Sequence, residues 1–227
     1  SNYTAAAYPN ILASDASGNV TVTLPAASSS NESVYYIKKT NSGTTNKVII
    51  DGNSSETIDG QATYTLYLQY DSIKIICDGS NWHILEKNIT PHVAKITRDA
   101  VQTISHDTVT VPTYDNTEID NAGISNLGTS RVTIKRAGKY LITMYTSFSI
   151  NYAKANWSGV RVNGSVKKWS NSYSSVTSGR PIPVLSVVLD LSSGDYVEGL
   201  VYHNSGGNEN TSTYIYYKPE LTVAEIM

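Results

Sequence analysis

Short apolar runs separated by glycine turns are the feature that most constrains this chain. The runs are rich in β-branched and aromatic residues, as in Val20–Leu24, Lys47–Asp51, Thr63–Leu68 and Ser72–Cys77. Asp-Gly, Asn-Gly and Ser-Gly pairs lie between many of them, and such pairs favour tight turns between strands. No stretch repeats with the 3.6-residue period of an amphipathic helix. The sequence therefore predicts an all-β protein.

Two segments alternate clearly enough to assign their faces. Apolar side chains share one face of the first segment: Tyr140, Ile142, Met144, Phe148 and Ile150. The other face carries Thr143, Tyr145, Ser147 and Ser149. Residues 185–191 alternate in the same way, with Leu185, Val187, Leu189 and Leu191 on one face. Both patterns predict strands of an antiparallel sheet with one buried face.

The composition excludes several classes of partner. A formal charge of −2 provides no electrostatic footprint for nucleic acid or an anionic membrane. No apolar run is long enough to span a bilayer, so we expect no membrane insertion. Cys77 is the single cysteine and lies in an apolar run, which predicts a buried hydrophobic side chain rather than a reactive thiol.

A domain boundary is expected near residues 88–92. The strand-like runs are short before it and longer after it, and Pro91 suits a linker. We therefore expect a connector or arm over residues 1–17, a small β module over 18–88 and a second domain over 93–227. No initiator Met precedes Ser1, and we expect the chain to be the C-terminal piece of a longer protein.

The second domain carries an ordered set of motifs. Its segments are Arg131–Ile134, Ala137–Tyr140, Val160–Gly164, Leu189–Val197 and Leu221–Ile226. In this order they resemble the jelly-roll head of the tumour necrosis factor and complement-q superfamily. There a G-x-Y opens a central strand, an N-G makes a hairpin, and L-x-L-x-x-G-D-x-V joins two strands. The resemblance implies a trimeric β-sandwich over residues 93–227, although no Gly-X-Y stalk precedes it.

The first module has a resemblance of its own. Its segments are Val20–Pro25, Val34–Lys39, Lys47–Gly52, Glu56–Gly60 and Ile76–Ile84. Together they are similar to a small β module of bacteriophage tail-fibre and appendage proteins. We expect each Asp-Gly pair to close a tight turn, and Trp82 to enter the core. Joined to a jelly-roll head, this module implies a virion fibre whose tip is the head and whose N-terminal end meets other fibre or baseplate proteins.

Catalytic motifs are absent from the sequence. Asp190, Asp195 and His203 lie close together, but Ser192–Asp195 predicts a turn in which Asp195 caps its own backbone. There is no G-x-S-x-G elbow, no zinc-ligand spacing and no phosphate-binding loop. Carboxylate pairs for glycoside hydrolysis could still be assembled from the 19 acids. We expect a protein that is not an enzyme and needs no cofactor.

One acidic stretch could hold a hard cation. Asp115 and Asp120 lie in YDNTEIDNAG, where oxygen ligands recur every two or three residues, as calcium requires. The stretch does not fit an EF-hand loop. A solvated loop with Asx-turns is the alternative, and we assign no metal site.

Aromatic and amide side chains gather in the long segment 151–183, which also contains Tyr152 and Trp157. Sugars stack their apolar face on a ring while amides and hydroxyls bond their polar groups. The candidate glycan contacts are Trp169, Tyr173, Asn171 and Lys168 there, and Tyr202, His203 and Asn204 in a second polar stretch. The alternative is that these rings pack between sheets or at subunit contacts.

The resulting hypothesis is a non-enzymatic phage receptor-binding protein on the virion. It would act outside the host cell and bind a bacterial surface polysaccharide. The alternatives are a structural head-fibre, collar or cell-surface decoration trimer, and a polysaccharide depolymerase. The run Thr213–Ile226 supports a homotrimer, because Tyr214 and Tyr216 alternate with Ile215 and Tyr217, and a sandwich can bury only one of these faces.

Overall fold

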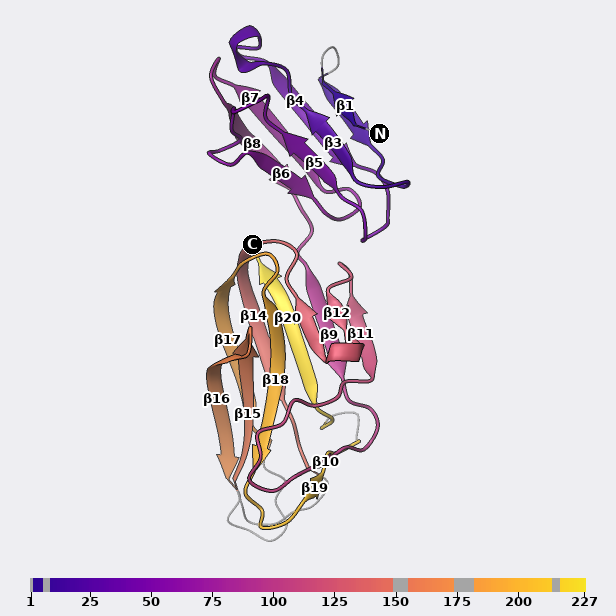
Figure 1. Cartoon of the computed structure of the whole chain (residues 1–227), viewed down its shortest axis with the longest axis vertical. Helices are drawn as coiled ribbons and strands as arrows, with labels where there is room; N and C mark the ends of the chain where they lie inside the picture. Colours follow the sequence, from indigo (N-terminus) through magenta and orange to yellow (C-terminus); the bar gives the residue numbers. More distant parts are fainter. Residues whose placement is uncertain (1, 6–8, 149–154, 174–181, 214–216) are drawn as a thin grey trace. The chain divides into compact units, whose positions relative to one another are not determined.

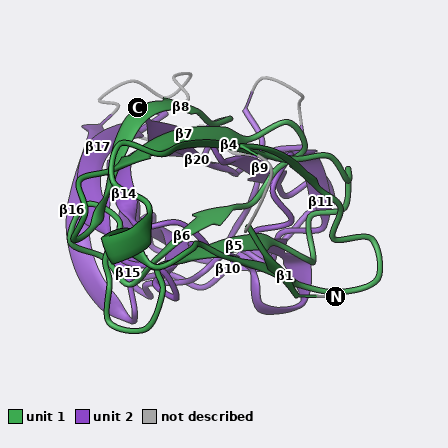
Figure 2. Ribbon diagram, turned by 90° about the horizontal axis from the view of Figure 1, so that it is seen from above, with its two compact units in different colours: residues 1–90 green, residues 91–227 purple. Residues whose placement is uncertain are grey.

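The computed structural model describes residues 2–5, 9–148, 155–173, 182–213 and 217–227. The chain forms two compact units, Ser1–Thr90 and Pro91–Met227 (Figures 1 and 2). Strands dominate both units, and the helical elements of the described residues are two short 3-10 turns, Ala27–Ser29 and Leu127–Thr129. The all-β prediction is confirmed. No helix in the described part of the chain has the length and apolar character that crossing a bilayer would need.

The first unit contains two four-stranded sheets. One has the order β1 (Tyr3–Thr4), β3 (Val20–Thr23), β5 (Val48–Asp51), β6 (Thr63–Leu66). The other has the order β2 (Asn10–Ala13), β4 (Val34–Lys39), β7 (Ser72–Cys77), β8 (Trp82–Asn88). Strands β1, β3 and β5 are parallel, as are β2 and β4. Parallel neighbours need a crossover, and here the intervening strand in the opposite sheet supplies it.

The N-terminal segment is part of these sheets. Strand β1 pairs with β3, and β2 pairs with β4, burying Ile11 and Ala13. The prediction that residues 1–17 form a separate connector is therefore wrong for their described part. A four-residue strand offers only two buried positions, which is too short a pattern to distinguish from a loop in the sequence.

The core of the first unit confirms two predictions. Trp82 is fully buried, packs edge-on against Tyr35 at 5.6 Å between ring centroids, and donates its indole N–H to Glu56 at 3.3 Å. Cys77 is buried in the same core. The polar atom of the indole is thus satisfied while the ring supplies apolar contact.

The Asp-Gly pairs behave differently from one another. Asp59 and Gly60, with φ of 47° and 79°, form a tight turn as predicted, and Gly79 has a φ of 89° in another turn. Gly52 departs from the prediction, because its N–H continues the ladder to the carbonyl of Ala62 at 3.3 Å. A Cβ there would lie 2.3 Å from the Glu56 carbonyl oxygen, so close backbone approach is what requires this glycine.

The second unit is a sandwich of two five-stranded sheets (Figure 1). The first sheet has the order β11 (Asn116–Asp120), β9 (Val93–Thr97), β20 (Glu220–Ile226), β14 (Gly138–Tyr145), β17 (Val184–Leu191). The second has the order β12 (Ser125–Asn126), β13 (Arg131–Thr133), β18 (Tyr196–His203), β15 (Ala155–Val162), β16 (Ser165–Tyr173). A small ribbon pairs β10 (Thr103–Ile104) with β19 (Glu209–Asn210). The chain changes sheet repeatedly and every neighbouring pair is antiparallel, which is the jelly-roll arrangement predicted for this half.

The alternation in β14 is confirmed where the structure describes it. Tyr140, Ile142 and Met144 are fully buried. Beyond the end of the strand at Tyr145 the pattern fails, because Ser147 is also buried and its carbonyl accepts a hydrogen bond from Ser212. Ser149 and Ile150 lie outside the described residues, as do the alternating residues 214–216.

The predicted turns of this unit are confirmed. Asn163 and Gly164 have φ of 51° and 78° and close the β15–β16 hairpin between Val162 and Ser165. Asp195 accepts a hydrogen bond from the Ser192 N–H at 2.8 Å, as the turn prediction required. This bond is the main reason why the pKa of Asp195 is lowered. The carboxylate therefore serves to hold the turn.

Candidate functional site

The outer face of the sheet containing β18, β15 and β16 carries the partly exposed rings of Trp157, Trp169 and Tyr202. Along β15, Val160 and Val162 are buried in the sandwich, so Trp157, Gly159 and Arg161 point outward. Cross-strand pairing places Trp157 between Tyr202 of β18 and Asn171 of β16. Three strands thus bring aromatic and amide side chains into one row.

A groove of about 280 Å³ opens on this face, lined by Val109, Trp157, Trp169 and Tyr202. The rings of Trp157 and Tyr202 meet edge to face, with centroids 4.7 Å apart and planes at 72°. This arrangement is favourable for aromatic pairs and fixes both rings without covering them completely. The groove therefore has apolar walls that stay accessible to a ligand.

Gly159 positions the second indole. A Cβ at Gly159 would lie 2.4, 2.6 and 2.8 Å from three atoms of the Trp169 ring system, which is closer than van der Waals contact permits. The indole therefore lies directly over the backbone of β15. The absent side chain leaves room for this ring at the wall of the groove.

The remaining wall comes from the segment before β11. Thr110 exchanges two backbone hydrogen bonds with Val201, at 2.9 and 2.8 Å, which attaches this segment to β18 and places Val109 beside the rings. The Tyr202 hydroxyl donates a hydrogen bond to the Asp107 carboxylate, and this bond raises the pKa of Tyr202. The groove thus has one anionic, hydrogen-bonding end.

The structure brings together only some of the predicted contacts. Trp169 and Tyr202 line the groove, and Asn171 is exposed in the row of Trp157. Tyr173 is 67% exposed at the end of β16 and does not line the groove. Lys168 alternates with Trp169 along the strand and points to the other side of the sheet. The four candidates from the segment 151–183 all belong to β16, one strand of the β15–β16 hairpin, and Tyr152 lies outside the described residues.

His203 is not a ligand contact. It is fully buried, its Nε2 donates to the carbonyl of Ile104 at 3.0 Å, and its ring meets Phe148 edge to face at 4.9 Å. As the residue after Tyr202 on β18, it faces the interior. Its place in the list of candidates was therefore wrong, whereas Asn204 is exposed beyond the strand but does not line the groove.

The carboxylates of the two calcium candidates already accept hydrogen bonds from backbone N–H groups. The Asp115 carboxylate accepts backbone N–H groups of Asp99 and Ala100 at 2.6 and 3.0 Å. Asp120 accepts those of Ile124 and Ser125 at 2.9 and 2.8 Å, as an Asx-type turn does. They lie at opposite ends of β11 and do not form a common site. In the described ranges no three His, Cys, Asp or Glu side chains gather in a way that could hold a metal ion.

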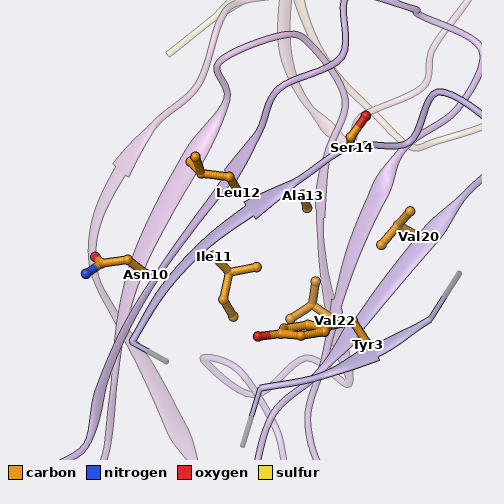
Figure 3. A pocket seen from close by; sticks show the side chains of 8 residues that line it. All are labelled: Tyr3, Asn10, Ile11, Leu12, Ala13, Ser14, Val20 and Val22. Atoms are coloured by element: carbon orange, nitrogen blue, oxygen red, sulfur yellow. The ribbon is translucent and has the colours of Figure 1, made fainter. Parts of the chain in front are cut away.

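A second pocket, of about 330 Å³, lies in the first unit, at the edges of its two sheets. Figure 3 shows Tyr3, Ile11 and Val22 close to one another there, while Leu12 and Asn10 point elsewhere. Leu12 is 72% exposed, but the pocket lining contains no charged side chain that would orient a ligand. It is a weaker candidate than the aromatic groove.

Sequence reasoning missed two members of the groove as contacts, Val109 and Trp157. The alternation of residues 155–162 could have found Trp157, since it puts an indole on the face opposite the buried valines. Nothing local marks Val109, because it reaches the groove through the pairing of Thr110 with Val201.

Comparison with known proteins finds likeness only at the level of structure. No family model matches the sequence, and no curated protein does. Eiger TNF from S. frugiperda is 13% identical over 60% of this chain and 93% of that chain, with a TM-score of 0.46. The globular domain of zebrafish complement 1qA is 13% identical over 60% and 97%, at a TM-score of 0.45. Murine APRIL is 13% identical over 60% of this chain and 100% of that chain, with a TM-score of 0.46. Likeness at this level says nothing about ligand or partner, and the jelly roll rests on the strand order of this chain itself.

Proposed function

We propose that this chain is the receptor-binding part of a bacteriophage tail fibre or appendage, and that its head binds a bacterial surface glycan without catalysis. The single observation that carries the glycan assignment is the groove of Trp157, Trp169, Tyr202 and Val109. The assignment to a phage virion rests on the resemblance of residues 18–88 to fibre modules. The site of action would be the outside of the host cell.

The chemistry of the groove suits a sugar. A pyranose presents a face of C–H groups that packs on an indole and a rim of hydroxyls that need hydrogen bonds. Two indoles supply the apolar surface here, and the exposed amide of Asn171 and the Tyr202–Asp107 pair supply donors and acceptors nearby. Polar groups beside an apolar wall fix the orientation of a ligand as well as its affinity.

Adsorption to bacteria tests this proposal. Trp157→Ala and Trp169→Ala should each weaken saturable binding to host cells or to their isolated polysaccharide, while the fold persists because both rings are only partly buried. Tyr70→Ala is the matched control, since Tyr70 is an aromatic residue 58% exposed in the other unit. Unchanged adsorption by both tryptophan variants would contradict the proposal. Release of new reducing ends from the polysaccharide would identify a depolymerase instead.

An apolar strip on the other sheet favours assembly as a second role. Leu141 of β14 is 39% exposed and pairs with Val188 of β17, itself 52% exposed, and with Ala224 of β20. Val184 adds a further exposed apolar side chain on β17. We propose that a homotrimer buries this strip, because closed symmetry covers such a face at finite size. A purely structural decoration trimer would share the strip but show no saturable glycan binding.

A further inference from the structure

A charged cluster lies on the same sheet face as the aromatic groove. Arg161 of β15 stands opposite Glu198 of β18, with its Nε 2.6 Å from one carboxylate oxygen. Arg131 of β13 reaches the other oxygen, with its Nη2 at 3.8 Å. The Glu198 side chain is only 6% exposed, whereas both arginine side chains are 32% exposed. The guanidinium groups are therefore the part of this cluster that a ligand can reach.

The cluster keeps an excess positive charge. Two guanidinium groups share one carboxylate, which leaves one net positive charge. Lys167 and Asp195, which interact electrostatically nearby, offset each other. Arg131 also lies over the ring of Tyr196, 4.2 Å from its centroid, and its buried Nε lacks a hydrogen-bond partner among the described residues. The ring of Tyr196 thus holds Arg131 in place, and the exposed part of its guanidinium group keeps N–H donors beyond the one contact with Glu198.

The register of the strands puts this cluster beside the groove. Arg161 follows Gly159 by two residues on the outward face of β15, and Trp169 lies over Gly159. Two residues of a strand span about 6.6 Å, so the guanidinium groups begin one row beyond the indole. On β18, Glu198 lies opposite Arg161 and Tyr202 lies opposite Trp157, so the charged and the aromatic positions are side by side on both strands. A ligand longer than one sugar ring would meet both features.

We propose that the groove selects an anionic glycan, with a sugar ring on Trp157 and Trp169 and its carboxylate or phosphate at Arg131 and Arg161. This inference rests on the proposed glycan-binding function and names the ligand class for the same site. Arginine suits this task because its planar fork bonds carboxylate and phosphate oxygens in pairs and stays charged at every relevant pH. The Asp107 carboxylate at the other end of the groove orients the ligand by repelling its acidic group.

A charge series at fixed shape provides the test. Arg131→Gln makes the cluster neutral while leaving the tight Arg161–Glu198 pair intact, and Glu198→Gln raises its net charge to two. Lys139→Gln is the control, because it removes one positive charge from an exposed pair with Asp190 on the opposite sheet. Each variant would be titrated against an immobilised panel of bacterial capsular polysaccharides, some bearing uronate, some phosphate and some neutral. The acidic members would also be tested after carboxyl reduction or dephosphorylation.

We expect the protein to bind the polysaccharides that carry uronate or phosphate, and to lose this binding when the carboxyl group is reduced or the phosphate is removed. Arg131→Gln should weaken that binding about tenfold, as loss of one charge-assisted bond does, and Glu198→Gln should strengthen it. Lys139→Gln should leave it unchanged, and uronate and phosphate members distinguish the two possible acids. A thermal melt of each variant separates these effects from loss of fold.

Other outcomes overturn the inference in distinguishable ways. Binding to neutral members that is indifferent to the charge series rejects the anionic ligand but keeps the glycan-binding function. Equal effects of Arg131→Gln and Lys139→Gln reject a local cationic site. Binding to no polysaccharide, with adsorption to cells abolished by protease treatment, rejects both the inference and the proposed function in favour of a protein receptor.

Discussion

Replacing Gly159 by alanine should damage the groove while sparing the fold. The new Cβ would lie 2.4 Å from the nearest atom of the Trp169 ring, and ordinary contact needs about 3.4 Å or more, so the ring must move by roughly 1 Å. The indole is at the surface side of the sheet and can tilt outward. The backbone of Gly159 has no positive φ, so alanine fits it without strain.

The expected energies separate binding from stability. Gly→Ala restricts the unfolded chain and favours folding by about 0.4–1 kcal/mol, while the clash opposes this by up to about 1–3 kcal/mol. The free energy of unfolding should therefore fall by no more than about 2–3 kcal/mol. Loss of stacking on a displaced ring, at about 1 kcal/mol, corresponds to roughly fivefold weaker glycan binding.

Calorimetric titration with the bound polysaccharide and a thermal melt measure both quantities on one sample. Gly207→Ala is the matched control, because a Cβ there meets nothing within 4 Å. A Gly159→Ala protein that binds with wild-type affinity would refute the role of Trp169 in the groove. An unfolded Gly159→Ala protein would show that the Trp169 indole cannot move outward, which would contradict its partly exposed position.

Four further outcomes follow from the same structure. Gly199→Ala should lower the melting temperature clearly, since its Cβ would lie 2.4 Å from the buried Tyr114 hydroxyl, and overpacking a core costs about 1–3 kcal/mol; an unchanged melt would contradict this. Trp82→Ala should cost about 3–5 kcal/mol in chemical denaturation of the first unit, because the ring is fully buried; a loss below about 1 kcal/mol would be inconsistent with that burial. Burial opposes the charge of Asp120, but hydrogen bonds from Ser125 and from backbone N–H groups outweigh it and lower the pKa of this carboxyl. The ionised carboxylate therefore stabilises the fold above about pH 4, and this contribution is lost as pH falls through the folded pKa. Asp120→Asn should make the free energy of unfolding fall less steeply at acid pH, and an unchanged pH dependence would count against this. Light scattering should give about three times the 24.6 kDa chain mass, reduced by Leu141→Asp, whereas a monomeric wild type at micromolar concentration would defeat the trimer.

Local pattern was sufficient for the elements that local chemistry determines. Asn163-Gly164 is a strong hairpin signal and does form the predicted turn, and the alternation of β14 identified its buried face. Pairing partners were not predictable in this way. Nothing in Tyr3–Thr4 or Asn10–Ala13 indicates that these strands lie parallel to β3 and β4, because parallel pairing joins segments through the opposite sheet.

The candidate site was predictable to the same extent. Trp169 and Tyr202 were identified by residue type, yet His203 was misassigned, since a polar-looking stretch hid a strand in which most residues, His203 among them, are buried. The groove itself depends on register: Trp157 opposite Tyr202, and Gly159 opposite Trp169. Trp157 and Tyr202 are more than 40 residues apart in the sequence, and no pattern within a single segment encodes such a pairing.

The most direct test of a glycan-binding groove is fluorine NMR of the protein labelled with 5-fluorotryptophan. The chain has three tryptophans, so three signals can be assigned by replacing each with phenylalanine. On titration with host surface polysaccharide, the signals of Trp157 and Trp169 should shift to saturation while that of the buried Trp82 stays fixed. Saturable binding that moves neither groove signal would place the glycan elsewhere and contradict the account.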